Sequence, residues 1–240
     1  MAKVAANKTR IWLDQWPFHG YLSSVGMTVN QETPDTTALS DDGPRRVPGN
    51  YDHSHSHNGF FDGAAAAFDE QIASLVDDDL HYQTINYGAG VEGTLSYSAA
   101  VRLASKPIAA SNGSATALNI SSEGSGQLAR GVLLRNATVT DTGAGTGINQ
   151  GTTSSGDEYS VTIHVSGTFS NLTVQVHQSS DDAAVDAYAL ITGLANTFSA
   201  AGAVRVSTTA ATEAWKRVSV TAFTGTDATI TVSGGLIAGT

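Results

Sequence analysis

The chain lacks cysteine altogether, so its 240 residues can form neither a disulfide bond nor a metal site built on thiolates. Charged residues are also scarce, at 14% against the roughly one quarter found in typical globular domains. No apolar run is long enough for a membrane-spanning helix, and the first residues lack the apolar core of a signal peptide. We therefore expect a protein made in the cytoplasm without a membrane anchor, its surface partly covered by neighbouring subunits.

Basic residues are few and scattered. The net charge is −10, with 9 basic and 14 acidic residues up to position 140, and 3 and 8 beyond it. The longest basic cluster is the pair Arg45 and Arg46. Because tight nucleic-acid binding needs many Lys and Arg contacts to phosphates, this composition excludes a dedicated DNA- or RNA-binding protein.

The order of elements between residues 21 and 76 is the most informative pattern. Residues 21–29 alternate apolar and polar side chains and predict a strand, and residues 51–61 predict a second one. Two prolines and two glycines within 43–49 favour a protruding loop or edge hairpin between them. A helix is predicted for 63–76, where one apolar stripe is formed by Phe68, Ile72, Leu75 and Val76.

Short strands dominate the remainder of the first part. They are predicted at residues 80–87, 93–103, 117–121 and 131–139. The chain is therefore expected to be mainly β, and residues 1–140 to form an antiparallel β-sandwich or barrel flanked by one helix.

A glycine-rich segment separates this part from a second one. Residues 141–157 contain five glycines and almost no apolar side chain, which predicts a flexible, poorly packed linker. Residues 158–240 then alternate clearly, with turns expected at 179–182 and 224–227, and predict a second antiparallel β-sandwich. Its predicted strand faces carry Tyr159, Val161, Ile163, Val165, Leu172, Val174, Val176, Val204, Val206, Val218, Val220, Ile230 and Val232.

The first part resembles the tail tube proteins of long-tailed, siphovirus-type bacteriophages. The motifs that carry the resemblance are SVGMTV at 24–29, DDGPRRVPG at 41–49, NGFFD at 58–62 and EGSGQLARGV at 123–132. It covers roughly residues 10–140 and implies a virion structural protein, without cofactor or enzymatic activity, that works with other tail proteins. Members of that family stack as rings, which the resemblance implies to be hexameric, into a hollow tube that conducts DNA during ejection. An acidic wall that repels DNA would suit such a conduit.

The second part resembles, less specifically, the β-sandwich modules appended to many phage tail proteins. The matching segments are SGTF at 166–169, LTVQV at 172–176 and WKRV at 215–218. If the chain forms a tail tube, residues 158–240 would decorate the exterior of the tube. Similar modules also serve in adhesion and carbohydrate binding, so an adhesin or carbohydrate-binding protein is the alternative. Exposed aromatic side chains on one sheet face would favour that alternative, and Tyr159, Tyr188 and Trp215 are the candidates.

Contacts between subunits are expected at two places. The loop 30–50 would reach an adjacent ring, where Arg45 and Arg46, beside Asp41 and Asp42, would pair with acidic groups of a neighbour. Near the N-terminus, Trp12 and Trp16 flank Pro17 with Phe18. These aromatic side chains either close the subunit's own core or dock on the next subunit.

Three alternating histidines form the most conspicuous chemical cluster. In a strand, His53, His55 and His57 share one face at roughly 7 Å intervals. They would lie in a subunit interface or on the lumen. The alternatives are a zinc or copper site, as in a metal-dependent enzyme, and a packing element that responds to pH. The run Asp77, Asp78 and Asp79 is expected to be a solvated turn, or alternatively to face the lumen. We assign no metal site and no catalytic residue, because no nucleophile or phosphate-loop motif has the flanking elements it needs.

Overall fold

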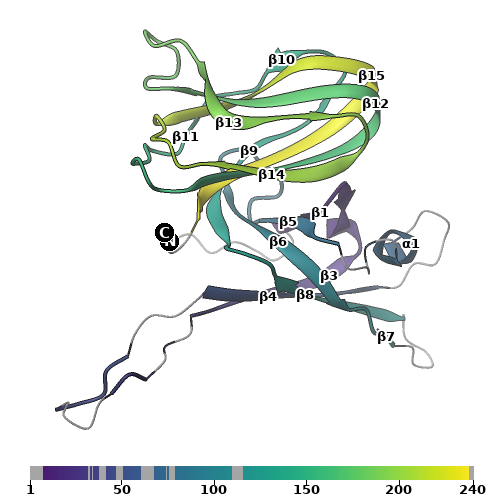
Figure 1. Ribbon diagram of the computed structural model, residues 1–240. Coiled ribbons are helices and arrows are strands. Elements are labelled where there is room, and N and C mark those ends of the chain that lie inside the picture. The colour runs from purple at the N-terminus through teal and green to yellow at the C-terminus, as the bar shows by residue number, and fades with distance from the viewer. Residues whose placement is uncertain are drawn as a thin grey trace.

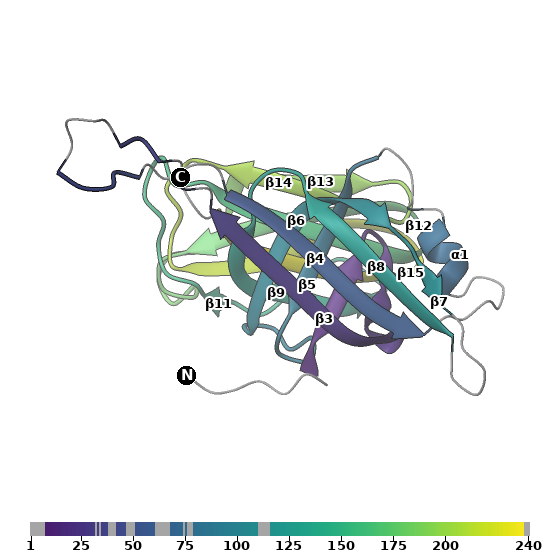
Figure 2. The same ribbon diagram turned by 90° about the horizontal axis from the view of Figure 1, so that it is seen from below.

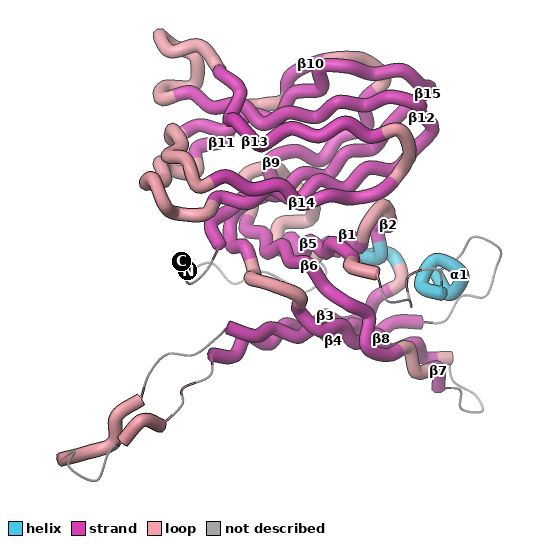
Figure 3. The backbone as a smooth tube through the Cα atoms, viewed as in Figure 1, coloured by secondary structure: helices cyan, strands magenta, loops and turns pink. Residues whose placement is uncertain are grey.

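The computed structural model describes residues 8–31, 33, 35–37, 42–46, 51–60, 68–73, 75, 79–109 and 116–237. Fifteen strands in this part of the chain join one hydrogen-bonded network, and every strand pair in it is antiparallel. The predicted mainly β, antiparallel class is therefore confirmed. The network is arranged as a lower and an upper group of strands (Figures 1 and 3).

The lower group forms a curved sheet in the order β3–β4–β8–β6–β5–β1. Its strands are β1 (Arg10–Leu13), β3 (Leu22–Gln31), β4 (Tyr51–Phe60), β5 (His81–Asn86), β6 (Leu95–Ser105) and β8 (Ala117–Gly124). Two short strands extend it, since β2 (Trp16–Pro17) pairs with β1 and β7 (Ile108–Ala109) pairs with β8. The strands predicted for 21–29, 51–61, 80–87, 93–103 and 117–121 are thus observed, with shifted ends.

Helix α1 (Phe68–Ala73) lies within the predicted span 63–76, whose other residues apart from Leu75 are outside the described part. Ile72 and Leu75 are buried, as the apolar stripe predicts. They belong to a core shared with strands of the lower sheet, whose other buried members are Leu13, Phe18, Ala99, Val101, Leu103, Leu118, Ile120 and Leu128.

The upper group is built on two long strands, β12 (Tyr159–Ser179) and β15 (Trp215–Ile237). They pair with each other along their whole length and bend in the middle, so each contributes to two sheets packed face to face. One sheet has the order β14 (Gly202–Thr208)–β12–β15–β9 (Ala129–Val139), and the other adds β13 (Ala189–Phe198) to the second half of β12. The separating turn predicted at 224–227 is wrong, because these residues continue β15.

Glycine permits the sharp bend. Gly167 has φ of +117°, a conformation that side chains with a Cβ rarely adopt. On β15, Gly225 pairs with Phe169, and a Cβ on Gly225 would lie 2.5 Å from Phe169 Cα. The register between β12 and β15 shifts at Thr168–Phe169 and Phe169–Asn171, as expected of β-bulges that turn a strand through a corner. Residues that read as a turn in the sequence therefore form a bulged corner inside a strand.

Alternate side chains of the bent strands fill the space between the two upper sheets. The buried members include Val161, Ile163, Val165, Leu172, Val174, Val176, Leu194, Val218, Val220, Ile230 and Val232. Burial of each such side chain contributes about 1.5–3 kcal/mol. This core is the main reason why the upper group forms a sandwich.

The predicted flexible linker 141–157 is a paired segment. Within it, β10 (Gly143–Ala144) and β11 (Ile148–Asn149) both pair with β15, and Thr153 bridges Thr212. The expectation of a free linker is wrong, because the edge of β15 supplies backbone partners that composition does not reveal. The division into two domains at this point stays a prediction, and β9 pairs with β15 across it.

A buried polar seam joins the upper group to the lower sheet. The turn after β1 places Asp14 at its centre: its side chain accepts hydrogen bonds from His81 Nδ1 at 2.6 Å and from the backbone N–H of Tyr82 at 2.8 Å. His164 of β12 donates from Nδ1 to the Asp14 carbonyl oxygen at 2.7 Å, and Thr84 donates to His164 Nε2 at 2.8 Å. These bonds hold the first turn, β5 and β12 together.

We expect Gly225→Ala to destabilise the chain by about 1–3 kcal/mol, because the new methyl group would collide with backbone atoms of Thr168 and Phe169. The matched control is Gly202→Ala, where an added Cβ meets no atom within 4 Å and the expected change is within about 0.5 kcal/mol. Urea unfolding of both variants measures the difference. Equal stability of the two would show that the corner tolerates a side chain.

Candidate functional site

The described part of the segment between β3 and β4, residues 33, 35–37 and 42–46, projects away from the body of the subunit (Figure 1). Its two arms are held by an antiparallel bridge between Asp35 and Arg46, and Thr36 N–H donates to Arg45 O at 2.9 Å. Thr37 adds to this pairing, since its hydroxyl accepts from the backbone N–H of Arg45 at 2.8 Å. The predicted protruding hairpin is therefore present.

The predicted contact residues of this hairpin are at its surface. Asp42, Arg45 and Arg46 are exposed, while Asp41 lies outside the described residues. Hydrogen bonds from the hydroxyl and N–H of Thr37 lower the pKa of Asp35. A carboxylate and two guanidinium groups thus lie at the surface of a projecting hairpin.

Strand β3, from which the hairpin starts, forms an edge of the lower sheet. It pairs with β4 on one side, and no other strand of the described chain pairs with it. The edge is ten residues long and contains no proline and no lysine. Natural proteins usually protect such an edge, because its free N–H and C=O groups can pair with another chain.

Among the described residues, nothing covers one face of strands β3, β4 and β8. Figure 2 views this free face from below, with the rest of the subunit behind the three strands. From the registers of the three strands, the residues with side chains on it include Ser24, Thr28, Asn30, Asp52, Ser54, Ser56, Asn58, Asn119, Ser121 and Glu123. Asp52 and Glu123 are the only charged groups among them, and Arg102 of β6 pairs in register with Glu123. The same register places Phe60, which is 54% exposed, on this face. The free face is thus a surface mainly of hydroxyl and amide groups, with one exposed aromatic side chain and weak negative charge.

The opposite face of β4 carries the three histidines, which lie inside the subunit. His53, His55 and His57 are 2%, 3% and 5% exposed, so the predicted position in a subunit interface or on the lumen is wrong. The alternation of side chains along a strand correctly predicted that the three histidines share one face. It does not reveal which face of the strand is covered by the rest of the subunit. His53 meets His55 edge to face with ring centroids 5.1 Å apart, and His55 stacks on His57 with centroids 6.3 Å apart.

Hydrogen bonds assign the neutral forms of the histidine rings. His53 donates from Nε2 to Gly126 O at 3.1 Å and accepts at Nδ1 from His55 Nε2 at 3.0 Å. His57 accepts at Nε2 from the Gln83 amide at 3.1 Å. The buried Nδ1 atoms of His55 and His57 have no partner. Burial lowers the pKa of His53, that of His55 to about 3 and that of His57 to about 4.

Of the remaining predicted contact residues, some lie inside the subunit and others at its surface. Trp12 is 5% exposed, and Trp16 is partly buried against the lower core, so both help to close the subunit's own interior. Asp79 is exposed, while Asp77 and Asp78 lie outside the described residues. Of the aromatic candidates in the upper group, Tyr159 is buried and Tyr188 and Trp215 are partly exposed.

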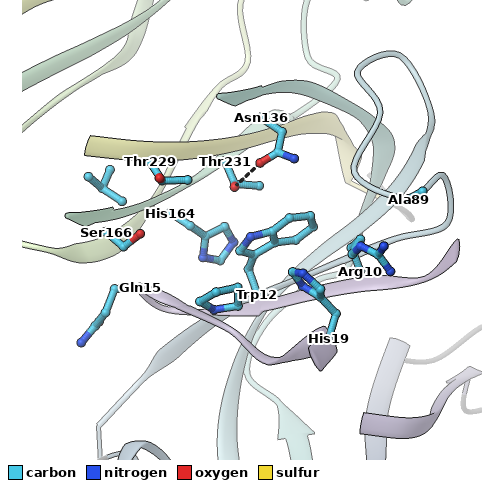
Figure 4. Close-up of a pocket in the computed structure, with 12 residues that line it drawn as sticks. Arg10, Trp12, Gln15, His19, Ala89, Asn136, His164, Ser166, Thr229 and Thr231 are labelled. Atoms are coloured by element: carbon cyan, nitrogen blue, oxygen red, sulfur yellow. Dashed lines mark hydrogen bonds between the residues drawn. The ribbon is translucent and has the colours of Figure 1, made fainter. Parts of the chain in front are cut away.

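A cavity of about 230 Å³ lies between the turn that joins β1 to β2 and the corner of the upper sandwich (Figure 4). Trp12, His19 and Gln15 form one wall, and His164, Ser166 and Thr229 belong to the other. Both ring nitrogens of His164 are engaged in the seam, which leaves no free base there. The arrangement offers binding surface but no nucleophile–base pair.

Within the described residues, no group of three or more His, Asp or Glu side chains could hold a metal ion. The same part of the chain contains no helix of the length and apolarity that crossing a membrane requires.

No sequence motif marks the polar residues of the seam. Asp14 and His164 are 150 positions apart, and neither belongs to a recognisable motif. Arg205 is a further case: it donates to Ser160 Oγ at 2.6 Å and to Gln127 O at 2.8 Å. Only the fold brings these residues together.

No protein-family model matches the chain, and no curated protein matches it. Among solved structures it is similar to a chain of the virion of a native gene transfer agent particle, with 20% identity, a TM-score of 0.44, and coverage of 54% of this chain and 98% of the other. It is similar to the SPP1 tail tube at 10% identity and a TM-score of 0.43, covering 52% of this chain and 77% of that one. The SPP1 Dit protein gives 9% identity and a TM-score of 0.38 over 94% of this chain and 98% of that chain.

These structures belong to the class of assembly that the sequence resembles. With TM-scores below 0.5 they carry no functional weight of their own. The hairpin, the β3 edge and the free face are the observations from which a function follows.

The buried histidines predict a loss of stability in acid. Their folded-state pKa values lie below the ordinary 6.5, so the unfolded chain binds more protons once the pH falls below about 6.5. Below that pH, each such histidine lowers the free energy of unfolding by about 1.4 kcal/mol for every unit by which the pH falls, until the pH reaches its folded-state pKa. Urea unfolding at pH 8, 6, 5 and 4.5 should show little change above pH 7 and a steep decline below 6.

The variant His57→Gln tests the assignment. It should reduce the slope of unfolding free energy against pH by about 1.4 kcal/mol per unit between pH 6 and 4.5, because one proton fewer is taken up on unfolding. An unchanged slope would mean that His57 is not a buried neutral group.

Proposed function

We propose that the chain is the structural subunit of a bacteriophage tail tube, in which rings of six subunits stack around a DNA-conducting bore. The observation that carries this proposal is that one sheet combines an unpaired ten-residue edge, an uncovered polar face and a projecting hairpin. A self-contained monomer has no use for all three together.

Ring closure would use the β3 edge. A strand of a neighbouring subunit would satisfy its free backbone groups, and repetition of this head-to-tail contact would close a ring. Because the rest of the subunit lies on one side of β3, β4 and β8, a ring joined through this sheet would turn the bodies outward and the free face inward.

The free face suits a bore through which DNA passes. Its hydroxyl and amide groups are hydrated, and its carboxylates, Asp52 and Glu123, repel phosphates. A strip of Lys and Arg would instead retain the DNA through counterion release. The DNA-repelling wall expected from the net charge of −10 is thus assigned to this face.

Stacking of rings would use the hairpin. A projecting element that contacts the next ring makes a heterologous contact, which repeats without closing and so produces a filament. Arg45 and Arg46 would pair with carboxylates of the neighbour, for which an acidic chain offers many partners. The upper sandwich, on the body side of the sheet, would then decorate the exterior of the tube in the virion.

Electron microscopy of the purified protein tests the function. Hollow tubes or stacked rings are the expected result. Discrete monomers that remain dispersed at high concentration would contradict the proposal and favour the alternative, an adhesin or carbohydrate-binding protein.

The hairpin contact has its own test. We expect Arg45→Glu/Arg46→Glu to shorten the tubes severely, with an unchanged circular dichroism spectrum, because charge reversal would repel the acidic partner. The matched control is Lys8→Glu/Arg130→Glu, which makes the same change in net charge at exposed residues outside the hairpin. Tubes of normal length from the hairpin variant would rule out the pairing, and equally short tubes from both variants would indicate a net-charge effect.

A further inference from the structure

The cavity beside Trp12 is formed by parts of the chain that are distant in sequence. The turn after β1 and the short helix at Phe18–Gly20 contribute Gln15 and His19, while the corner of the upper sandwich contributes Ser166 and Thr229. Figure 4 shows these side chains around one space, with Trp12 and His164 at its centre. The seam at Asp14 fixes the two walls relative to each other.

Several polar groups of the cavity wall lack partners. His19 Nδ1 is buried and forms no hydrogen bond. Within the described part of the chain, no hydrogen bond is formed by the Gln15 carboxamide, by the Ser166 hydroxyl or by the indole N–H of Trp12, whose side chain is almost wholly buried. Polar groups at a cavity wall that have no protein partner can form hydrogen bonds with a bound molecule.

The other polar groups of the wall are fixed in position. Thr231 donates to Asn136 Oδ1 at 3.0 Å, and the Asn136 amide donates to Gly90 O at 3.1 Å. Thr229 shares a hydrogen bond of 3.0 Å with Thr138. Their oxygens still have lone pairs to accept further hydrogen bonds, now with a defined geometry.

The cavity wall contains no carboxylate. Burial, followed by the charge of Arg10, lowers the pKa of His19, which therefore stays neutral at pH 7. Apolar surface comes from the indole of Trp12, Pro17 and Val165. The wall thus combines an aromatic and aliphatic surface with neutral donors and acceptors and one guanidinium group, that of Arg10.

We propose that this cavity binds a single sugar ring, such as the terminal hexose of a glycan. A pyranose has C–H faces that pack on aromatic and aliphatic surface, and a rim of hydroxyl groups that both donate and accept. A space of 230 Å³ is smaller than the pockets that hold drug-sized molecules, and it suits one ring rather than an extended oligosaccharide. Gln15 and Ser166 would bind ring hydroxyls, and the Trp12 N–H would donate to a ring or hydroxyl oxygen.

This assignment differs from the sandwich-face alternative considered for the sequence, because the site lies at the junction of the two strand groups. It does not depend on tube formation, since both walls belong to one subunit. It also lies on the body side of the free face, away from the proposed bore.

Saturation-transfer NMR and calorimetry on the full chain test the proposal, with the methyl glycosides of glucose, galactose and mannose and with N-acetylglucosamine as probes. At least one hexose should bind, with intrinsic tryptophan fluorescence changing at the same concentrations. Gln15→Ala and Ser166→Ala should each weaken that binding roughly three- to tenfold through loss of a hydrogen bond.

The matched control is Gln175→Ala, which removes the same carboxamide from a partly exposed position on β12 outside the cavity. It should leave the sugar affinity unchanged. Ser166→Phe, which fills the cavity, should abolish binding, while an unfolding midpoint close to that of the native chain shows that the fold is intact. Absence of binding by every probe at tens of millimolar, or equal losses in Gln15→Ala and Gln175→Ala, would overturn the proposal.

Discussion

The structure depends on the hydrogen bonds that converge on Asp14. Its carboxylate holds β5 through His81 and the Tyr82 N–H, while its carbonyl oxygen holds β12 through His164. Buried polar groups are costly when unpaired, so satisfied bonds at such a seam favour one relative placement of the two strand groups over others. Ser96 and Ser233, whose hydroxyls are 2.6 Å apart, add a second contact of the same kind. This placement leaves β3, β4 and β8 with one free face.

The same placement is reinforced by strands that serve both groups. β6 pairs with β5 and β8 in the lower sheet and also with β9, which in turn pairs with β15 of the upper sandwich. Continuous backbone pairing transmits position more rigidly than a flexible connection between two domains would. In the proposed tube, a decoration fixed in this way would have a defined orientation, and a force on the exterior would reach the sheet around the bore.

Local patterns in the sequence predicted the local elements well. Alternation identified β3, β4 and the inward-facing valines of β12, and the apolar stripe placed Ile72 and Leu75 in the core. The failures are all non-local. The Thr224–Asp227 stretch reads as a turn, yet it pairs opposite the bulged corner of β12. Residues 141–157 read as a linker because composition does not show the edge of β15 that they join. No sequence pattern indicated the cavity beside Trp12 either, since its walls come from distant parts of the chain that meet only after folding.

The two faces of the sheet β3–β4–β8 connect acid stability with assembly. Its inner face carries neutral histidines whose protonation opposes folding, while its outer edge is the proposed contact between subunits. A partner that binds only the folded edge stabilises the whole sheet by mass action. Linkage then requires that assembly lower the effective pKa of these histidines further, because their protonation must now oppose both folding and the subunit contact. The histidines would be less readily protonated in the assembled tube than in the free subunit, although none of them touches the neighbour.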